Sequence, residues 1–198
     1  GCTVDSHKQG EGDNVKIATP FGGISVKTDY NAVEVSTGLP TYPGAEIVTK
    51  RDHDGHSSGA ADINMSFGSF QLRVKAISYR TPDSPDKVLA FYRKNLGRFG
   101  TVIQCSDHQP VGTPTHTPEG LDCSDDHGDN KIKAKMNESF SDKTELKAGS
   151  KLHQHIVAID PEGSGTKFGL VVLDLPGHLP FGDQDSDKDA NGSNRPKE

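Results

Sequence analysis

The stretch INMSFGSFQLRVKAISYR (63–80) decides the fold, because it holds the clearest strand pattern in the chain. Apolar residues occupy every second position on both sides of Gly68-Ser69: Ile63, Met65 and Phe67 before the pair, and Phe70, Leu72, Val74 and Ala76 after it. The alternation changes phase at the glycine, and such a change would turn every side chain of a continuous strand to the other face. We therefore predict two strands joined by a two-residue hairpin turn, with a glycine bulge as the alternative. A second phase change, at Ile77 and Tyr79, predicts a bulge near the end of the second strand.

The segment TPDSPDKVLAFYRKNLGRFG (81–100) carries the signals of a helix. Ser84 suits the N-cap, Pro85 suits the first helical position, and Gly97 or Gly100 suits the end. Apolar residues recur at helical spacing, at Val88, Leu89, Tyr92, Leu96 and Phe99. We predict one main helix over about 84–97, with its apolar face packed on the sheet.

Shorter apolar runs predict further strands on both sides of this unit. The runs 15–19 and 24–28 flank a Pro-Phe-Gly-Gly turn and predict a hairpin, and other runs lie at 46–50, 101–105, 132–136, 152–159 and 167–175. The order of strands, one helix and then strands predicts an α+β fold. We expect a mostly antiparallel sheet of about six to eight strands packed against the main helix.

Composition divides the 198 residues into one core and two polar ends. Residues 1–14 hold a single aliphatic residue, Val4, and predict a flexible tether. Residues 15–178 predict a single α+β domain, with a long loop at 106–130 that is rich in Pro, Thr, Gly and Asp. Residues 179–198 predict a disordered acidic tail.

The charge pattern argues against nucleic acid as a partner. The formal net charge is -6, and the lysines and arginines are scattered along the chain instead of forming a basic stripe. No run approaches the roughly 18 apolar residues that a membrane-spanning helix requires. The chain also lacks the P-loop and dinucleotide-binding patterns, so we expect no cofactor.

The three cysteines divide into one in the polar N-terminal segment and a pair in the core region. Cys2 follows Gly1, and a cysteine after a small residue is typical of the start of a mature bacterial lipoprotein, so we predict Cys2 as a lipid anchor. Cys105 and Cys123 are 18 residues apart, and we expect them to form a disulfide in an oxidising compartment. These expectations place the chain on the periplasmic or cell-surface face of a bacterial membrane, in contact with it through the anchor only. The alternative is that Cys2 is an ordinary thiol.

Three stretches, LPTYPGA (39–45), TPDSPDKVLAFY (81–92) and ELKAGS (145–150), suggest a family. They resemble a group of uncharacterised exported bacterial proteins, often lipoproteins, with a Y-P-G-A stretch and a T-x-D-S-x-x-x-V-x-x-F-Y helix. The resemblance covers residues 15–176. It implies that the protein is exported. It assigns no catalytic activity, because the proteins of this group are uncharacterised.

His153 and His155 are a candidate metal site. They are one residue apart on a predicted strand, so both side chains should project from the same face, where they could chelate a transition metal. A third ligand would be needed, and His53, His56 and His127 are candidates. The alternative is that the two histidines face solvent without a metal.

The C-terminal sequence DKDANGSNRPKE (187–198) matches the pattern of a calcium-binding loop. The matching residues are Asp187, Asp189, Asn191, Gly192 and Glu198. A calcium loop of this kind lies between two helices, whereas a Pro-Phe-Gly segment precedes this one and Pro196 lies within it. A solvated acidic tail explains the sequence better.

The sequence contains no G-x-S-x-G nucleophile motif, and Cys105 and Cys123 are too far apart for a C-x-x-C redox pair. The leading hypothesis is therefore a noncatalytic, envelope-anchored domain that binds another envelope component or a small ligand. One alternative is a metal-binding envelope protein that uses His153 and His155. A second alternative is a hydrolase of unknown substrate.

Overall fold

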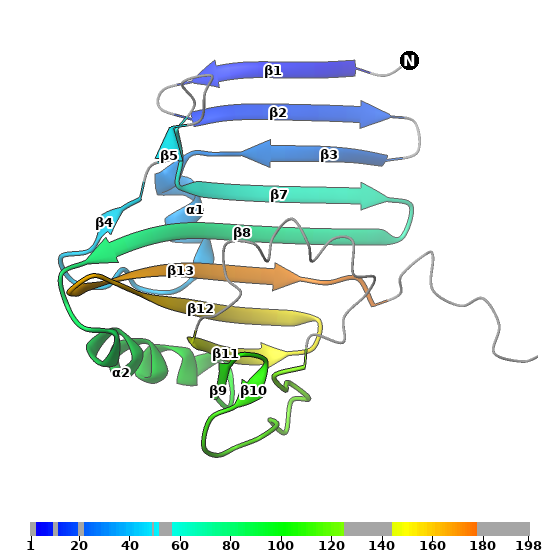
Figure 1. The fold of residues 1–198 in the computed structure, drawn as a ribbon. Helices are drawn as coiled ribbons and strands as arrows, with labels where there is room; N and C mark the ends of the chain where they lie inside the picture. The colour runs from blue at the N-terminus through cyan, green and yellow to red at the C-terminus, as the bar shows by residue number, and fades with distance from the viewer. Residues whose placement is uncertain are drawn as a thin grey trace, which may run out of the picture.

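The structure is a computed structural model that describes residues 3–9, 12–19, 22–48, 50–51, 57–124 and 144–177. It confirms the α+β class and the antiparallel sheet. The strands are β1 Thr3–Gln9, β2 Gly12–Thr19, β3 Gly22–Lys27, β4 Glu46–Ile47, β5 Lys50–Arg51, β6 Ser57–Ser58, β7 Ala60–Phe67, β8 Phe70–Thr81, β9 Ile103–Ser106, β10 Gln109–Pro110, β11 Thr144–Ser150, β12 His153–Glu162 and β13 Gly165–Asp174. Figure 1 shows most of them side by side in one open sheet.

The sheet is larger than predicted. It has 11 strands in the order β1-β2-β3-β7-β8-β13-β12-β11-β9-β10, with β4 paired to β8 outside this path. Its strand pairs are all antiparallel, and β5 and β6 form a separate two-stranded sheet. The prediction of six to eight strands was too low because it omitted strands that have little apolar content, above all β1.

The predicted tether at 1–14 is corrected by the structure. Within it, β1 spans Thr3–Gln9 and pairs antiparallel with β2, which begins at Gly12. Backbone hydrogen bonds to a neighbouring strand hold a polar segment in a sheet, so apolar content is not required of an edge strand. The predicted tail at 179–198 and the predicted strand at 132–136 lie outside the described residues.

Both predicted hairpins are confirmed. In the β7–β8 hairpin, Phe67 lies opposite Phe70, and Gly68 in the turn has φ 59°, a value that glycine adopts readily. In the β2–β3 hairpin, Thr19 lies opposite Gly22.

The bulge predicted near Ile77 is wrong. Strand β8 pairs with β13 without interruption from Arg73 to Thr81. The alternation of its apolar residues changes phase because the two halves of the strand present apolar side chains on opposite faces of the sheet. The first half of β8 has Leu72 and Val74 on one face, and the second half buries Ile77 and Tyr79 on the other.

Helix α2 spans Pro85–Leu96 and continues as the short helix η1, Gly97–Phe99. This confirms the predicted main helix, with Ser84 at the N-cap position in an extended conformation but without a side-chain capping hydrogen bond. A second helix, α1 at Tyr30–Thr37, was not predicted. Helix α1 packs against β7 and β8, and α2 packs against β11 and β12. Among the described residues, no helix is long and apolar enough to cross a membrane.

One hydrophobic core lies between the helices and the sheet. Its largest fully buried side chains include Tyr79, Tyr92, Leu96, Leu146 and Phe168. A smaller cluster lies around the predicted disulfide, which the structure confirms: Cys105 and Cys123 are bonded, with an S–S distance of 2.01 Å. The disulfide joins β9 to the end of the described part of the predicted 106–130 loop.

Candidate functional site

The first polar cluster is built around Tyr42, and it joins two of the stretches on which the family resemblance rests. The Tyr42 hydroxyl donates a hydrogen bond to Oδ2 of Asp83 at 2.7 Å. The backbone N–H of Tyr42 donates to the hydroxyl of Tyr92 on α2 at 3.1 Å. The ring of Tyr42 also lies edge-on to Phe91, with 5.1 Å between centroids. The Y-P-G-A stretch is thus attached directly to the T-P-D-S-P helix.

The ionisation of this cluster suits a structural role. The Lys87 ammonium group, 2.7 Å from Oδ1 of Asp83, and then the Tyr42 hydroxyl hold the pKa of the Asp83 carboxyl below its usual value. The hydrogen bond to Asp83 raises the pKa of the Tyr42 hydroxyl, and burial raises that of Tyr92. At neutral pH the cluster therefore consists of neutral phenols and a paired carboxylate, an arrangement that fixes the 39–45 segment to the helix.

The second polar cluster contains the predicted metal ligands. The structure confirms that His153 and His155 project from the same face of β12, with 5.1 Å between ring centroids. Asp174 lies opposite His153 on β13, and its Oδ1 atom accepts a hydrogen bond from Nδ1–H of His153. A carboxylate in this position orients an imidazole ring and leaves its Nε2 atom for another partner.

His155 lies in a different environment from its neighbour. Its side chain is 4% exposed, and its ring stacks on Phe99 at a centroid distance of 3.6 Å. Its Nδ1 atom is buried without a hydrogen-bond partner in the described structure. Burial, followed by the charge of His153, lowers the pKa of His155 to about 4. Asp174 opposes this shift, whereas Arg98 and Lys75 add to it.

The described residues contain no group of three histidine, cysteine or carboxylate side chains that could bind one metal ion. The candidate third ligands His53, His56 and His127 lie outside the described part of the chain. The metal hypothesis for His153 and His155 therefore stays a prediction.

The buried imidazole leads to a prediction about pH. The pKa of His155 is 6.5 in the unfolded state and about 4 in the folded state. The contribution of the neutral imidazole to the free energy of unfolding is therefore fully present above pH 6.5, and it is lost as the pH falls from 6.5 toward 4. We expect His155 to reduce the free energy of unfolding by about 2 kcal/mol at pH 5 relative to pH 7.5.

The measurement is urea unfolding of the wild type and of His155→Leu at both pH values. The variant keeps an apolar group against Phe99 but cannot be protonated, so it supplies the background pH dependence of the other groups. The difference between the free energies of unfolding of the two proteins should change by about 2 kcal/mol between pH 7.5 and pH 5. A difference that is the same at both pH values would show that His155 is not held neutral by the fold.

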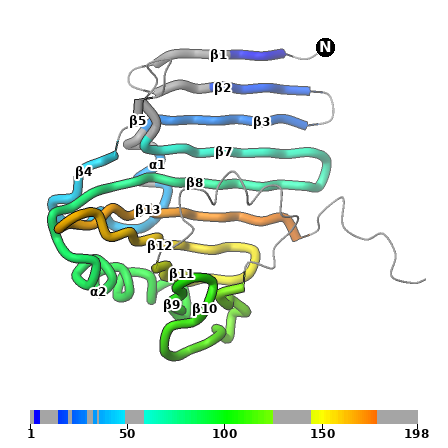
Figure 2. The backbone as a smooth tube through the Cα atoms, in the orientation of Figure 1, coloured from blue at the N-terminus to red at the C-terminus, as the bar shows by residue number. Residues whose placement is uncertain are grey.

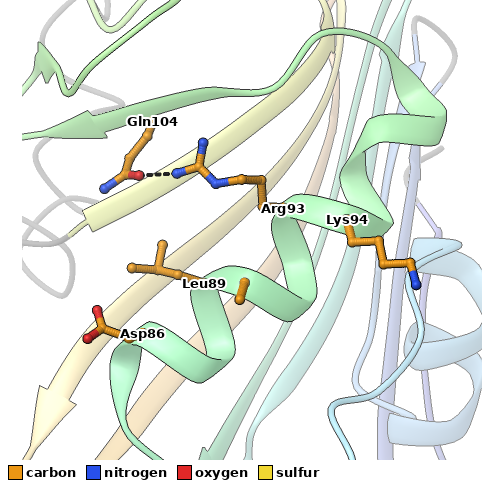
Figure 3. Close-up of a pocket in the computed structure, with 6 residues that line it drawn as sticks. Asp86, Leu89, Arg93, Lys94 and Gln104 are labelled. Carbon is orange, nitrogen blue, oxygen red and sulfur yellow. Dashed lines mark hydrogen bonds between the residues drawn. The ribbon is translucent and has the colours of Figure 1, made fainter.

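A hollow of about 580 Å³ lies between α2 and β9. It is lined by Asp86, Leu89, Ala90, Arg93, Lys94 and Gln104. Figure 3 shows Arg93 extending from the helix to a hydrogen bond with the side chain of Gln104, whereas Lys94 points away. The charged groups of the hollow are exposed and of both signs. Water screens such groups, so they carry little binding energy for a specific ligand.

An apolar surface lies on the N-terminal half of the sheet. We call it the apolar sheet face, and it consists of Val4, Val15, Ile17, Ile24, Val26 and Met65. All six side chains are exposed or half-buried. Three of the strands that carry them, β1, β2 and β3, lie beyond β7 and β8, the strands against which α1 packs (Figures 1 and 2). Sequence reasoning missed this face, although the second phase change in β8 was a signal that the sheet buries opposite faces in its two halves.

The remaining predicted site residues lie outside the described part of the chain. These are the lipid-anchor candidate Cys2 and the calcium-loop residues Asp187, Asp189, Asn191 and Glu198.

Comparison with known proteins adds no relative: no family model matches the chain, and neither a curated protein nor a solved structure is significantly similar to it.

Proposed function

We propose that this chain is a noncatalytic domain, anchored in a bacterial envelope by lipid on Cys2, that contacts another envelope component. The observation that carries the proposal is the apolar sheet face. Exposed aliphatic side chains that lie together on neighbouring strands are typical of an interaction site. The exposed fractions of Val4, Val15 and Ile17 are 66%, 37% and 36%.

The disulfide supports the compartment. Disulfides form and persist in secreted and periplasmic proteins, whereas reducing agents of the cytosol keep most thiols free. The bond between Cys105 and Cys123 closes a loop of 18 residues, and Leu121 packs with Ile103 of β9 beside it. An exported domain would acquire this bond, and its acidic, polar surface suits the periplasm or the cell surface.

The start of β1 decides which part of the fold an acylated Cys2 would hold. Strand β1 begins at Thr3, the residue after it. An acylated Cys2 would hold the sheet itself, and not a distant domain on a tether, at the membrane surface. Two or more acyl chains on one cysteine make such attachment stable.

The proposal is tested by expressing the full-length gene in a bacterial host with labelled palmitate. We expect label and membrane fractionation for the wild type, and neither for Cys2→Ser. In the same cells, a photocrosslinking amino acid at position 24, on the apolar sheet face, should give a defined adduct whose partner is identified by mass spectrometry.

The matched control carries the crosslinker at position 25, the next residue of β3, whose side chain projects from the opposite face. Little adduct is expected there. An unlabelled wild type would refute the anchor, and equal adducts at positions 24 and 25 would refute the contact through this face.

A further inference from the structure

We infer that the apolar sheet face docks onto the lipid surface itself, so that the envelope component in contact with it is the bilayer. This inference rests on the proposed function, because it takes Cys2 as the anchor that brings the sheet to the membrane. The face would lie against the acyl chains just below the headgroups.

The register of the strands makes the face continuous. Val4 lies opposite Ile17, Ile17 opposite Ile24, and Ile24 opposite Met65, so one apolar row crosses four strands. Directly opposite residues of neighbouring antiparallel strands share a face and lie in contact distance of each other. A second row, through Val15, runs parallel to the first.

The same strands are polar on their other face. Lys16 lies opposite Ser25, and Ser25 opposite Asn64. The N-terminal half of the sheet is therefore amphipathic across its thickness. Amphipathic helices with an aliphatic face and a charged face lie in the plane of a membrane interface, and this part of the sheet offers the same two faces.

On this side of the sheet the apolar side chains become more exposed from β8 toward β1. Val74 on β8 is 7% exposed, Ile17 on β2 is 36% exposed, and Val4 on β1 is 66% exposed. Val4 is two residues from Cys2 in the sequence, so at most about 7 Å of chain separates their Cα atoms. Acyl chains on Cys2 would keep the bilayer within reach of the most exposed part of the face, at a high effective concentration. A second copy or a protein partner would have to arrive by diffusion, and the bilayer is therefore the favoured occupant.

The test uses the full chain with Cys2→Ser, so that no acyl chain contributes to binding. The protein is sedimented with sucrose-loaded vesicles of phosphatidylethanolamine and phosphatidylglycerol. We expect measurable binding that persists at about 0.5 M salt, because salt screens charge but leaves apolar burial intact.

The variants compare the two faces of the same strands. Ile17→Asn with Ile24→Asn should weaken vesicle binding by about tenfold or more, because each aliphatic side chain loses its transfer into hydrocarbon. The matched control, Lys16→Asn with Ser25→Asn, should bind like the parent. Val4 is 66% exposed, so Val4→Asn should not disturb the fold. It should also weaken vesicle binding, and it replaces the double variant in the test if circular dichroism shows that the double variant is poorly folded.

Three results of the vesicle assay would overturn the inference: no vesicle binding, binding lost at high salt, or equal losses in the apolar and polar double variants. Concentration-dependent dimers that only Ile17→Asn with Ile24→Asn abolishes, without vesicle binding, would assign the face to a second copy and also overturn it. Acylation is measured separately on the wild type. Failure of the anchor at Cys2 is thereby distinguished from failure of the face to bind lipid.

Discussion

The Phe168→Ala variant is expected to lose about 3 to 5 kcal/mol of unfolding free energy, the largest loss that we predict for any single substitution in this chain. Phe168 on β13 is 2% exposed, and its ring contacts the aromatic rings of Tyr42, Tyr79 and Tyr92. Removing it leaves a cavity between α2 and the sheet that the surrounding rings fill only in part. Urea unfolding at neutral pH measures the loss.

The matched control is Phe67→Ala. Phe67 ends β7, and its side chain is 40% exposed, so its truncation should cost about 1 kcal/mol or less. Similar losses for the two variants would contradict the assignment of the core to the helix side of β13.

Replacing both disulfide cysteines, Cys105→Ala with Cys123→Ala, is expected to lower the free energy of unfolding by about 3 kcal/mol. The cross-link closes an 18-residue loop and so limits the conformational entropy of the unfolded chain. Without it, the unfolded chain gains entropy and the free energy of unfolding falls. The variant should keep its sheet, because β9 remains paired with β11 through backbone hydrogen bonds. Urea unfolding, followed by circular dichroism, measures the change.

The control is the wild type in the presence of a thiol reductant. Reduction should bring the wild type to the stability of the double variant and should leave the double variant unchanged. Identical unfolding midpoints for the oxidised wild type and the double variant would show that the disulfide does not stabilise the fold.

Local signals in the sequence were sufficient for several elements. The glycine of Gly68-Ser69 allows the positive φ of a two-residue turn, and Ser84-Pro85 suits the first turn of α2, so neither depends on distant residues. The side chains of His153 and His155 share a face because strand geometry alone requires it. The pairing of Cys105 with Cys123 followed from the placement of the only other cysteine in the N-terminal segment.

Other features depended on contacts between distant segments. Helix α1 has a β-branched sequence, YNAVEVST, and its formation depends on burial of Val33 against β7 and β8. The apolar sheet face arises from the register of β1, β2, β3 and β7, which no single strand specifies.

The sequence by itself therefore determined the α+β class, the two hairpins, the main helix and the cystine, because each rests on neighbouring residues or on residue type. The tertiary structure decided which face of each half of the sheet is buried, because α1 packs on one face of β7 and β8 and α2 packs on β11 and β12. It also decided the chemistry of His155, because its partner Phe99 is 56 positions away in the chain and only the fold stacks the two rings.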